Sequence, residues 1–185
     1  LIVTLRPNEG IFNNESLRRI EKIENEILEI DGVNQVLSIL DAPIVEQPKV
    51  SLSEIGDNIK YLLDESIDLQ KAKQEILSNP IYQELIVSKD GSTTAFQILL
   101  DKNESYETLI QQRYDLLESD KPSALLEVNR KINEQNSLIQ EKEKRIVAEI
   151  RSVINNNRDF GVLFLGGPAM IANDMIDFIK SDLSI

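Results

Sequence analysis

The chain of 185 residues contains no cysteine and no histidine. Without cysteine it has no disulfide, no thiolate nucleophile and no structural zinc site of the usual kind. Histidine is the commonest general base near neutral pH and the commonest side-chain ligand of transition metals. We therefore expect a protein that is not an enzyme, with no catalytic residue, no metal site and no cofactor.

Basic residues are scarce as well. The 20 Lys and Arg stand against 32 Asp and Glu, so the net charge is -12. Proteins that bind phosphate backbones need clustered Lys and Arg, and no such cluster occurs here, so we expect no nucleic-acid partner. The carboxylates alternate with Lys along helix-like stretches, a pattern more typical of solvated helix faces than of catalytic acid and base pairs.

Long apolar runs are also absent. No segment reaches the ~20 apolar residues that cross a bilayer, and nothing resembles a signal peptide. The chain nevertheless begins at Leu1 inside a strand-like run and ends at Ile185 in an apolar helix pattern without a cap. We expect both ends to continue into a larger protein, of which residues 1–185 form one domain.

The first forty residues show the pattern of a strand, a helix and a second strand. Apolar and polar residues alternate over 1–6, the period of a strand. Asn13 or Asn14 is placed to cap a helix that ends at Asp31-Gly32. A second apolar run predicts a strand over 33–40. The helix between them carries one apolar stripe: Leu17, Ile20, Ile23, Ile27 and Ile30.

Residues 41–78 read as an insertion of loop and short helices. The stretch between Pro43 and Pro48 has no periodicity, and the helix patterns cover 52–63 and 68–77. Asn79-Pro80 ends the second of these patterns, because the residue before a proline is disfavoured in a helix.

A hairpin is predicted next. Two apolar runs, 85–87 and 93–100, flank Asp90-Gly91, and Asp-Gly between two strand patterns is a strong short-range hairpin signal. The aspartate would also be placed to meet a cation, yet the hairpin alone explains it.

Residues 104–156 predict a long helical hairpin insertion. A helix over 104–118 is followed by one over 123–156, which at ~1.5 Å per residue would be on the order of 50 Å long. The second helix has an apolar residue at every seventh position, a seam wide enough for one partner helix. We expect 104–145 to project from the body and the end of the helix to lie on the sheet. The apolar positions are Tyr106, Ile110, Tyr114 and Leu117 in the first helix and Leu125, Ile132, Ile139, Ile146 and Val153 in the second.

The last segment reads as a strand, a tight corner and a helix. The run 162–165 has no polar residue, which predicts a strand covered on both faces. Gly166 and Gly167 interrupt it, and Pro168 suits the first turn of a helix. The glycine pair is placed to bind an anion on its N–H groups, but a corner where side chains would clash is the simpler interpretation.

These elements predict an α+β sandwich. Without the insertion at 41–78 their order is a βαββαβ frame, the ferredoxin-like split βαβ, carrying helical insertions that include the projecting hairpin. Fold alone does not give function.

Three segments of the chain carry a set of positions that recur in a known family. These positions are Gly32, Val33, Val36 and Ser38; Asn79, Pro80, Tyr82, Ser88, Asp90, Gly91 and Thr94; and Gly166, Gly167, Pro168, Asp174 and Asp182. With them the chain resembles the first extracytoplasmic, porter-like loop of exporters in the resistance-nodulation-division (RND) superfamily, in its MMPL-like branch. Residues 41–78 and 104–156 match only in helical character.

The resemblance implies a periplasmic or extracytoplasmic domain of an inner-membrane protein, driven by proton flow through membrane helices outside these residues. It implies the rest of the transporter chain as partner and a lipid-like or amphipathic substrate, whose binding residues it does not identify. A homo-oligomer or an accessory protein would dock on 104–145. The alternative is an interaction or sensor domain that transports nothing and recruits a partner through the helical hairpin.

Overall fold

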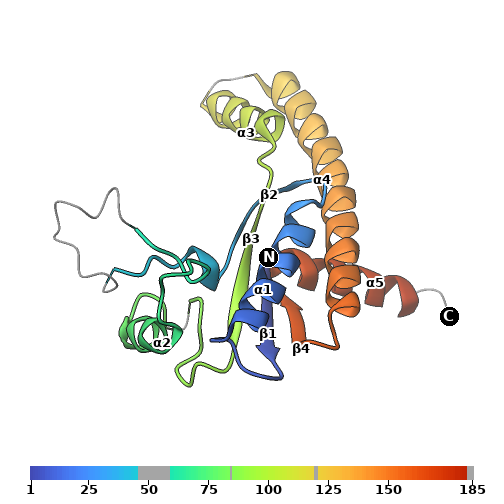
Figure 1. Ribbon diagram of the computed structural model, residues 1–185. Coiled ribbons are helices and arrows are strands. Elements are labelled where there is room, and N and C mark those ends of the chain that lie inside the picture. Colours follow the sequence, from blue (N-terminus) through green and yellow to red (C-terminus); the bar gives the residue numbers. More distant parts are fainter. Residues whose placement is uncertain (46–58, 84, 119–120, 183–185) are drawn as a thin grey trace.

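The computed structural model describes residues 1–45, 59–83, 85–118 and 121–182 (Figure 1). In these ranges the protein is mixed α+β, with a four-stranded antiparallel sheet, five α-helices and one short 3-10 helix. The elements are β1 (Ile2–Pro7), α1 (Asn14–Leu28), β2 (Val33–Leu37), the 3-10 helix η1 (Ile39–Asp41), α2 (Leu69–Ser78), β3 (Thr94–Leu100), α3 (Glu104–Leu117), α4 (Pro122–Asn156), β4 (Gly161–Gly166) and α5 (Pro168–Asp182).

The strands lie in the order β2-β3-β1-β4, and each is antiparallel to its neighbours. β1 therefore pairs with β3 and β4, with Thr4 opposite both Ala95 and Phe164. β3 separates β1 from β2, so these two strands run in the same direction. The ladder between β1 and β4 is regular from Ile2 opposite Gly166 to Pro7 opposite Gly161.

One face of the sheet carries the core. α1 and the second half of α4 cover it (Figure 1) and bury their apolar stripes against Val3, Leu5 and Phe96. Asn13 caps the N-terminus of α1, because its Oδ1 accepts a hydrogen bond from Ser16 N at 2.8 Å. Fully burying one such aliphatic side chain contributes about 1.5–3 kcal/mol. The helix residues in the core are Leu17, Ile20, Ile23 and Ile27 from α1 and Ile146, Ile150 and Ile154 from α4.

The opposite face of the sheet is open, which corrects the expectation of a strand covered on both faces at 162–165. Leu163 is buried, but Val162 is 50% exposed and Phe164 is 67% exposed. Ile2 on β1 is exposed on the same side. An apolar run of four residues does not distinguish a strand covered on both faces from an apolar strand with one bare face.

α4 lies in two environments. Its second half packs on the sheet, while its first half lies beyond the end of the sheet beside α3 (Figure 1). There Val128 and Ile132 are buried against α3, and Arg113 Nε donates to Asn129 Oδ1 at 3.0 Å. We call residues 104–145 the arm and the rest of the described chain the body.

The apolar face of α3 agrees with the predicted stripe at Tyr106 and Ile110, which are half-buried, and differs from it in the second half of the helix. Tyr114 and Leu117 are more than half exposed, whereas Leu109 and Leu116 are half-buried. α3 therefore turns its Leu109 side toward α4, and the bond from Arg113 to Asn129 fixes this orientation. The predicted stripe is therefore wrong only in its second half, where it is displaced by about one residue around the helix.

Two short strand predictions were too long. Ile39 and Leu40 belong to η1 instead of β2, because Ser38 and Asp41 form a capping box: Leu40 N donates to Ser38 Oγ, and Ser38 N donates to Asp41 Oδ2 at 2.8 Å.

Residues 85–87 contribute only isolated bridges at Val87. Side-chain caps here replace the ladder hydrogen bonds of a strand.

The two helix predictions in 41–78 have different outcomes. The helix at 68–77 coincides with α2, whose first turn is capped by Asp68. Most of the helix predicted at 52–63 falls on 46–58, outside the described residues. Its described end is not helical: Ile44 N donates to Lys60 O at 2.8 Å, and a turn follows.

Candidate functional site

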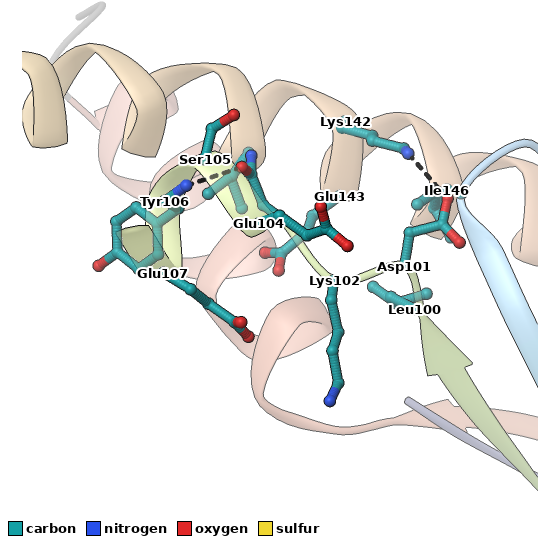
Figure 2. Close-up of a pocket in the computed structure, with 13 residues that line it drawn as sticks. Leu100, Asp101, Lys102, Glu104, Ser105, Tyr106, Glu107, Lys142, Glu143 and Ile146 are labelled. Carbon is teal, nitrogen blue, oxygen red and sulfur yellow. Dashed lines mark hydrogen bonds and ion pairs between the residues drawn. The ribbon is translucent and has the colours of Figure 1, made fainter. Parts of the chain in front are cut away.

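A pocket of about 560 Å³ lies where the arm leaves the body, and we call it the junction pocket (Figure 2). It is bounded by the end of β3, the first turn of α3 and the middle of α4. Its lining residues are Gly32, Leu100, Asp101, Lys102, Asn103, Glu104, Ser105, Tyr106, Glu107, Ile139, Lys142, Glu143 and Ile146.

The apolar part of the lining comes from Leu100, Ile139 and Ile146, with the Tyr106 ring at one end. Ile146 also belongs to the core, so the wall of the pocket on this side is the surface of the packed body. Ligand pockets in proteins are typically concave, mostly apolar and equipped with a few polar groups. The junction pocket has this composition.

Gly32 lets α4 approach the turn after α1. Its φ is +98°, and a Cβ there would lie 2.3 Å from Lys142 Cε and 2.8 Å from Ile146 Cδ1. The left-handed backbone strains any residue with a side chain, and a Cβ would in addition force the ends of these two side chains to move. The wall of the pocket on this side therefore depends on a glycine.

Two ion pairs tie α4 to the body beside the pocket. Lys142 Nζ lies 3.2 Å from Asp101 Oδ2, at the opposite end of the pocket from Tyr106 (Figure 2), and Arg145 Nη2 lies 2.9 Å from Asp31 Oδ2. Asp101 N also donates to Gly32 O at 2.9 Å. All four charged side chains are well exposed, so each pair contributes about 0–1 kcal/mol.

Carboxylates dominate the rim of the pocket. Glu104 and Glu107 stand in the first turn of α3, where the positive end of the helix dipole favours them, and Asn103 Oδ1 caps the same turn at Tyr106 N. Glu143 faces the pocket from α4. The Lys102 side chain extends away from the Lys142–Asp101 pair (Figure 2). The site offers an apolar wall with an acidic rim, and its lining contains no paired nucleophile and base.

Gly32 is a family-matched residue, but the other matched residues described below lie away from the junction pocket. Asn79 ends α2, and its Oδ1 accepts from Ile81 N at 2.9 Å across the exposed Pro80. Tyr82 is half-buried, and its hydroxyl donates to Pro43 O at 3.5 Å. Burial, and then the charge of Glu75, raise the pKa of Tyr82. These residues tie the loop after η1 to the turn after α2.

Asp90 closes the hairpin turn. Its carboxylate accepts from the Ser88 hydroxyl, from Ser92 N at 3.0 Å and from Ser92 Oγ at 2.8 Å, and these hydrogen bonds lower its pKa to about 2. A Cβ on Gly91 would lie 3.0 Å from the Leu77 side chain of α2. The turn therefore packs against α2, which brings Asp90 and Gly91 into the same region as Asn79 and Tyr82.

Gly166, Gly167 and Pro168 form the corner between β4 and α5. Gly166 pairs with Ile2, and Gly167 has a φ of +121° with its α-carbon close to Leu1. A Cβ at Gly167 would lie 3.3 Å from Leu1 Cα. Pro168 starts α5. The corner and the turn near Asn79 are separate, and none of these matched residues lines the junction pocket.

Sequence reasoning did not find the junction pocket. Its lining comes from Gly32, from 100–107 and from 139–146, three segments that only the tertiary fold brings together. The one local signal was Gly32 after the first helix, which was interpreted as a helix end. The pattern of apolar residues along the chain does not indicate that α4 packs against Gly32.

Within the described ranges, no three acidic side chains gather in a way that would hold a metal ion. No helix in the same ranges is both long and apolar enough to cross a membrane. Comparison of the chain with models of protein families, with curated proteins and with solved structures finds no match.

Proposed function

We propose that this chain is an extracytoplasmic, porter-like domain of a proton-driven RND-type exporter of the MMPL-like branch. The observation that carries the proposal is the backbone at two family-matched glycines. Gly32 and Gly167 both have positive φ and close neighbours, so glycine is the residue that these positions require. The matched pattern is thus tied to the fold of the chain.

The sheet supports a ferredoxin-like core as part of this proposal. The strand order β2-β3-β1-β4, with α1 and the second half of α4 on one face, is the arrangement that a βαββαβ frame produces. α2 and the arm are then insertions into that frame, one after β2 and one after β3.

In this proposal the junction pocket contributes to substrate passage and to conformational coupling. Its apolar wall suits a lipid-like or amphipathic molecule. Because its lining comes from both the body and the arm, a movement of α4 relative to β3 would change its size. The membrane helices that flank this domain in such an exporter would supply that movement.

The test is made in the full-length protein. Topology reporters fused at the hairpin turn near Asp90 should report an extracytoplasmic position, and a cytoplasmic signal there would refute the proposal. Ile139→Glu, which places a charge in the pocket, should reduce export of an amphipathic dye severalfold. Gln140→Glu is the matched control, because Gln140 is the next residue of α4 and faces solvent.

A second candidate function is an interaction or sensor domain that recruits a partner through the arm. It is favoured by the large apolar side chains that the arm exposes: Tyr114, Leu117, Leu126 and Leu138. Under this alternative the full-length protein would export no dye, with or without Ile139→Glu. The partner, a second copy or an accessory protein, would dock on residues 104–145. Replacing Leu126 and Leu138 with Lys would then weaken its association.

A further inference from the structure

The two edges of the sheet are built differently. β2, at one edge, has a register shift between Val33 and Gln35, and its Asn34 and Gln35 are exposed. β4, at the other edge, pairs with β1 in unbroken register over six residues. A bulge and polar side chains protect an edge strand from pairing with another chain, whereas a regular apolar edge invites it. Only β2 carries this protection.

β4 is also free of charge. Gly161–Gly166 contains no charged or polar side chain, although 28% of the whole chain is charged. Val162 and Phe164 expose half or more of their side chains on the open face of the sheet. Pairing this edge with another strand would bring cross-strand side chains against them on the same face and cover part of this apolar surface.

α5 leaves the same edge. It begins at the corner after β4, contacts α4 on one side and extends beyond β4 away from the body (Figure 1). Arg151 of α4 pairs with Asp174 at 2.7 Å and holds the helix at this angle. Ile171, Met175, Phe178 and Ile179 are each more than half exposed. α5 thus carries exposed apolar side chains next to the space beside the edge strand.

We propose that a second copy of this chain occupies that space, with β4 of one copy pairing antiparallel with β4 of the other across a two-fold axis. The strand is compatible with itself in this arrangement. Centring the axis on Leu163 places Val162 opposite Phe164, and centring it on Phe164 places that residue opposite itself. In both registers the open faces of the two sheets lie on the same side, because opposed residues of an antiparallel pair share a face.

With this symmetry a single partner covers both the free edge of β4 and the exposed apolar side chains of α5. An isologous interface uses the same patch on each copy, so each α5 would extend over the other copy's sheet edge. The paired strands alone are small, on the order of 20 Å long and 5 Å wide. A stable dimer buries about 800 Å² per partner. The two α5 helices, each on the order of 20 Å long and 10 Å wide, are therefore part of the interface.

Charge favours this face over the others. Two chains with a net charge of -12 each repel one another, and a strand without carboxylates is where they approach at the lowest cost. Salt screens the remaining repulsion, so association should strengthen as salt is raised. This interface is separate from the arm and does not rest on the proposed exporter function.

Sedimentation velocity of residues 1–185 tests the proposal. We expect a monomer–dimer equilibrium that shifts toward the dimer at higher salt. Phe164→Lys should raise the Kd of the dimer about tenfold or more. The fold should tolerate it, because the side chain is exposed. Leu99→Lys is the matched control: it lies on the same open face but on the interior strand β3.

Cross-linking gives a second readout, since the chain has no cysteine of its own. The double variant Val162→Cys, Phe164→Cys covers both registers and should form a disulfide-linked dimer under mild oxidation. Leu99→Cys should not. A monomer at all concentrations, a dimer unaffected by Phe164→Lys, or a dimer lost only with substitutions in the arm would each overturn the proposal. So would a chain that stays monomeric and binds phosphatidylcholine vesicles through Phe178.

Discussion

The two halves of α4 belong to one uninterrupted helix, yet they are held in different ways. In the body, Ile146, Ile150 and Ile154 join a core built with α1 and the sheet. In the arm, Val128 and Ile132 lie outside that core, and the helix that packs beside them, α3, has no buried residue. Helices gain most of their stability from packing of an apolar face. One continuous helix is therefore packed tightly in the core at its C-terminal half and packed weakly, against one helix, at its N-terminal half.

The largest effect is expected in the body half. Ile150 is fully buried, and Ile150→Ala leaves a cavity in a close-packed core, so it should lower the free energy of unfolding by about 3–4 kcal/mol. Urea unfolding followed by circular dichroism measures this. A loss below about 1 kcal/mol would show that the body half is no better packed than the arm.

The equivalent change in the arm should cost less. Ile132 is buried beside α3, which is able to move into the space left by Ile132→Ala, so we expect a loss of about 2 kcal/mol, the low end for such substitutions. Hydrogen exchange should show amides of 108–140 exchanging faster than those of 93–100 and 162–165, because weakly packed elements open locally.

A deletion separates the halves outright. Replacing 104–140 with a short Gly/Ser linker should leave a folded body with most of its thermal stability. Unfolding of the whole domain by this deletion would place the arm in the core and contradict the comparison.

A substitution in the body away from α4 should have an intermediate effect. Gly167→Val forces a β-branched residue into a φ of +121° and toward Leu1 Cα, at a cost of about 1–2 kcal/mol. The melting temperature should fall accordingly. If Gly167→Val is as stable as the parent chain but abolishes export in the full protein, the corner has a functional role instead.

The smallest effect concerns protons. In the body, burial raises the pKa of Glu24 above its ordinary 4.5, although the Ser38 hydroxyl donates to it. In the arm, hydrogen bonds and charge from Arg130 lower the pKa of Glu127 below 4.5. NMR titration of the carboxyl resonances measures both pKa values. The midpoint should lie above 4.5 for Glu24 and below 4.5 for Glu127.

The signs for stability follow by linkage. The contribution of Glu24 is complete below its unfolded pKa and is lost as the pH rises through its raised folded pKa. The contribution of Glu127 is present above pH 4.5 and is lost as the pH falls through its lowered pKa. Acid should therefore weaken the arm relative to the body, and an arm that became more protected in acid would contradict this.

Local chemistry made much of the fold predictable. Asn13 and Asp68 cap the helices that were expected to start there, and the broad stripe at the end of α4 marks the half that enters the core. The Ser38 and Asp41 capping box is readable from its spacing, and it could have ended β2 correctly. Predictions failed where a neighbour decides: the side of α3 that meets α4, and the bare face beside Phe164. The junction pocket could not be predicted, because it exists only between distant segments.

The unbroken backbone of α4 makes it a lever. Its 35 residues span roughly 50 Å, and the fulcrum lies where Lys142 and Arg145 meet Asp101 and Asp31. From Ile146 to Pro122 the helix reaches on the order of 35 Å. A tilt of only ~5° at the core end would therefore carry the tip by ~3 Å, a gain in displacement that needs no hinge within the helix.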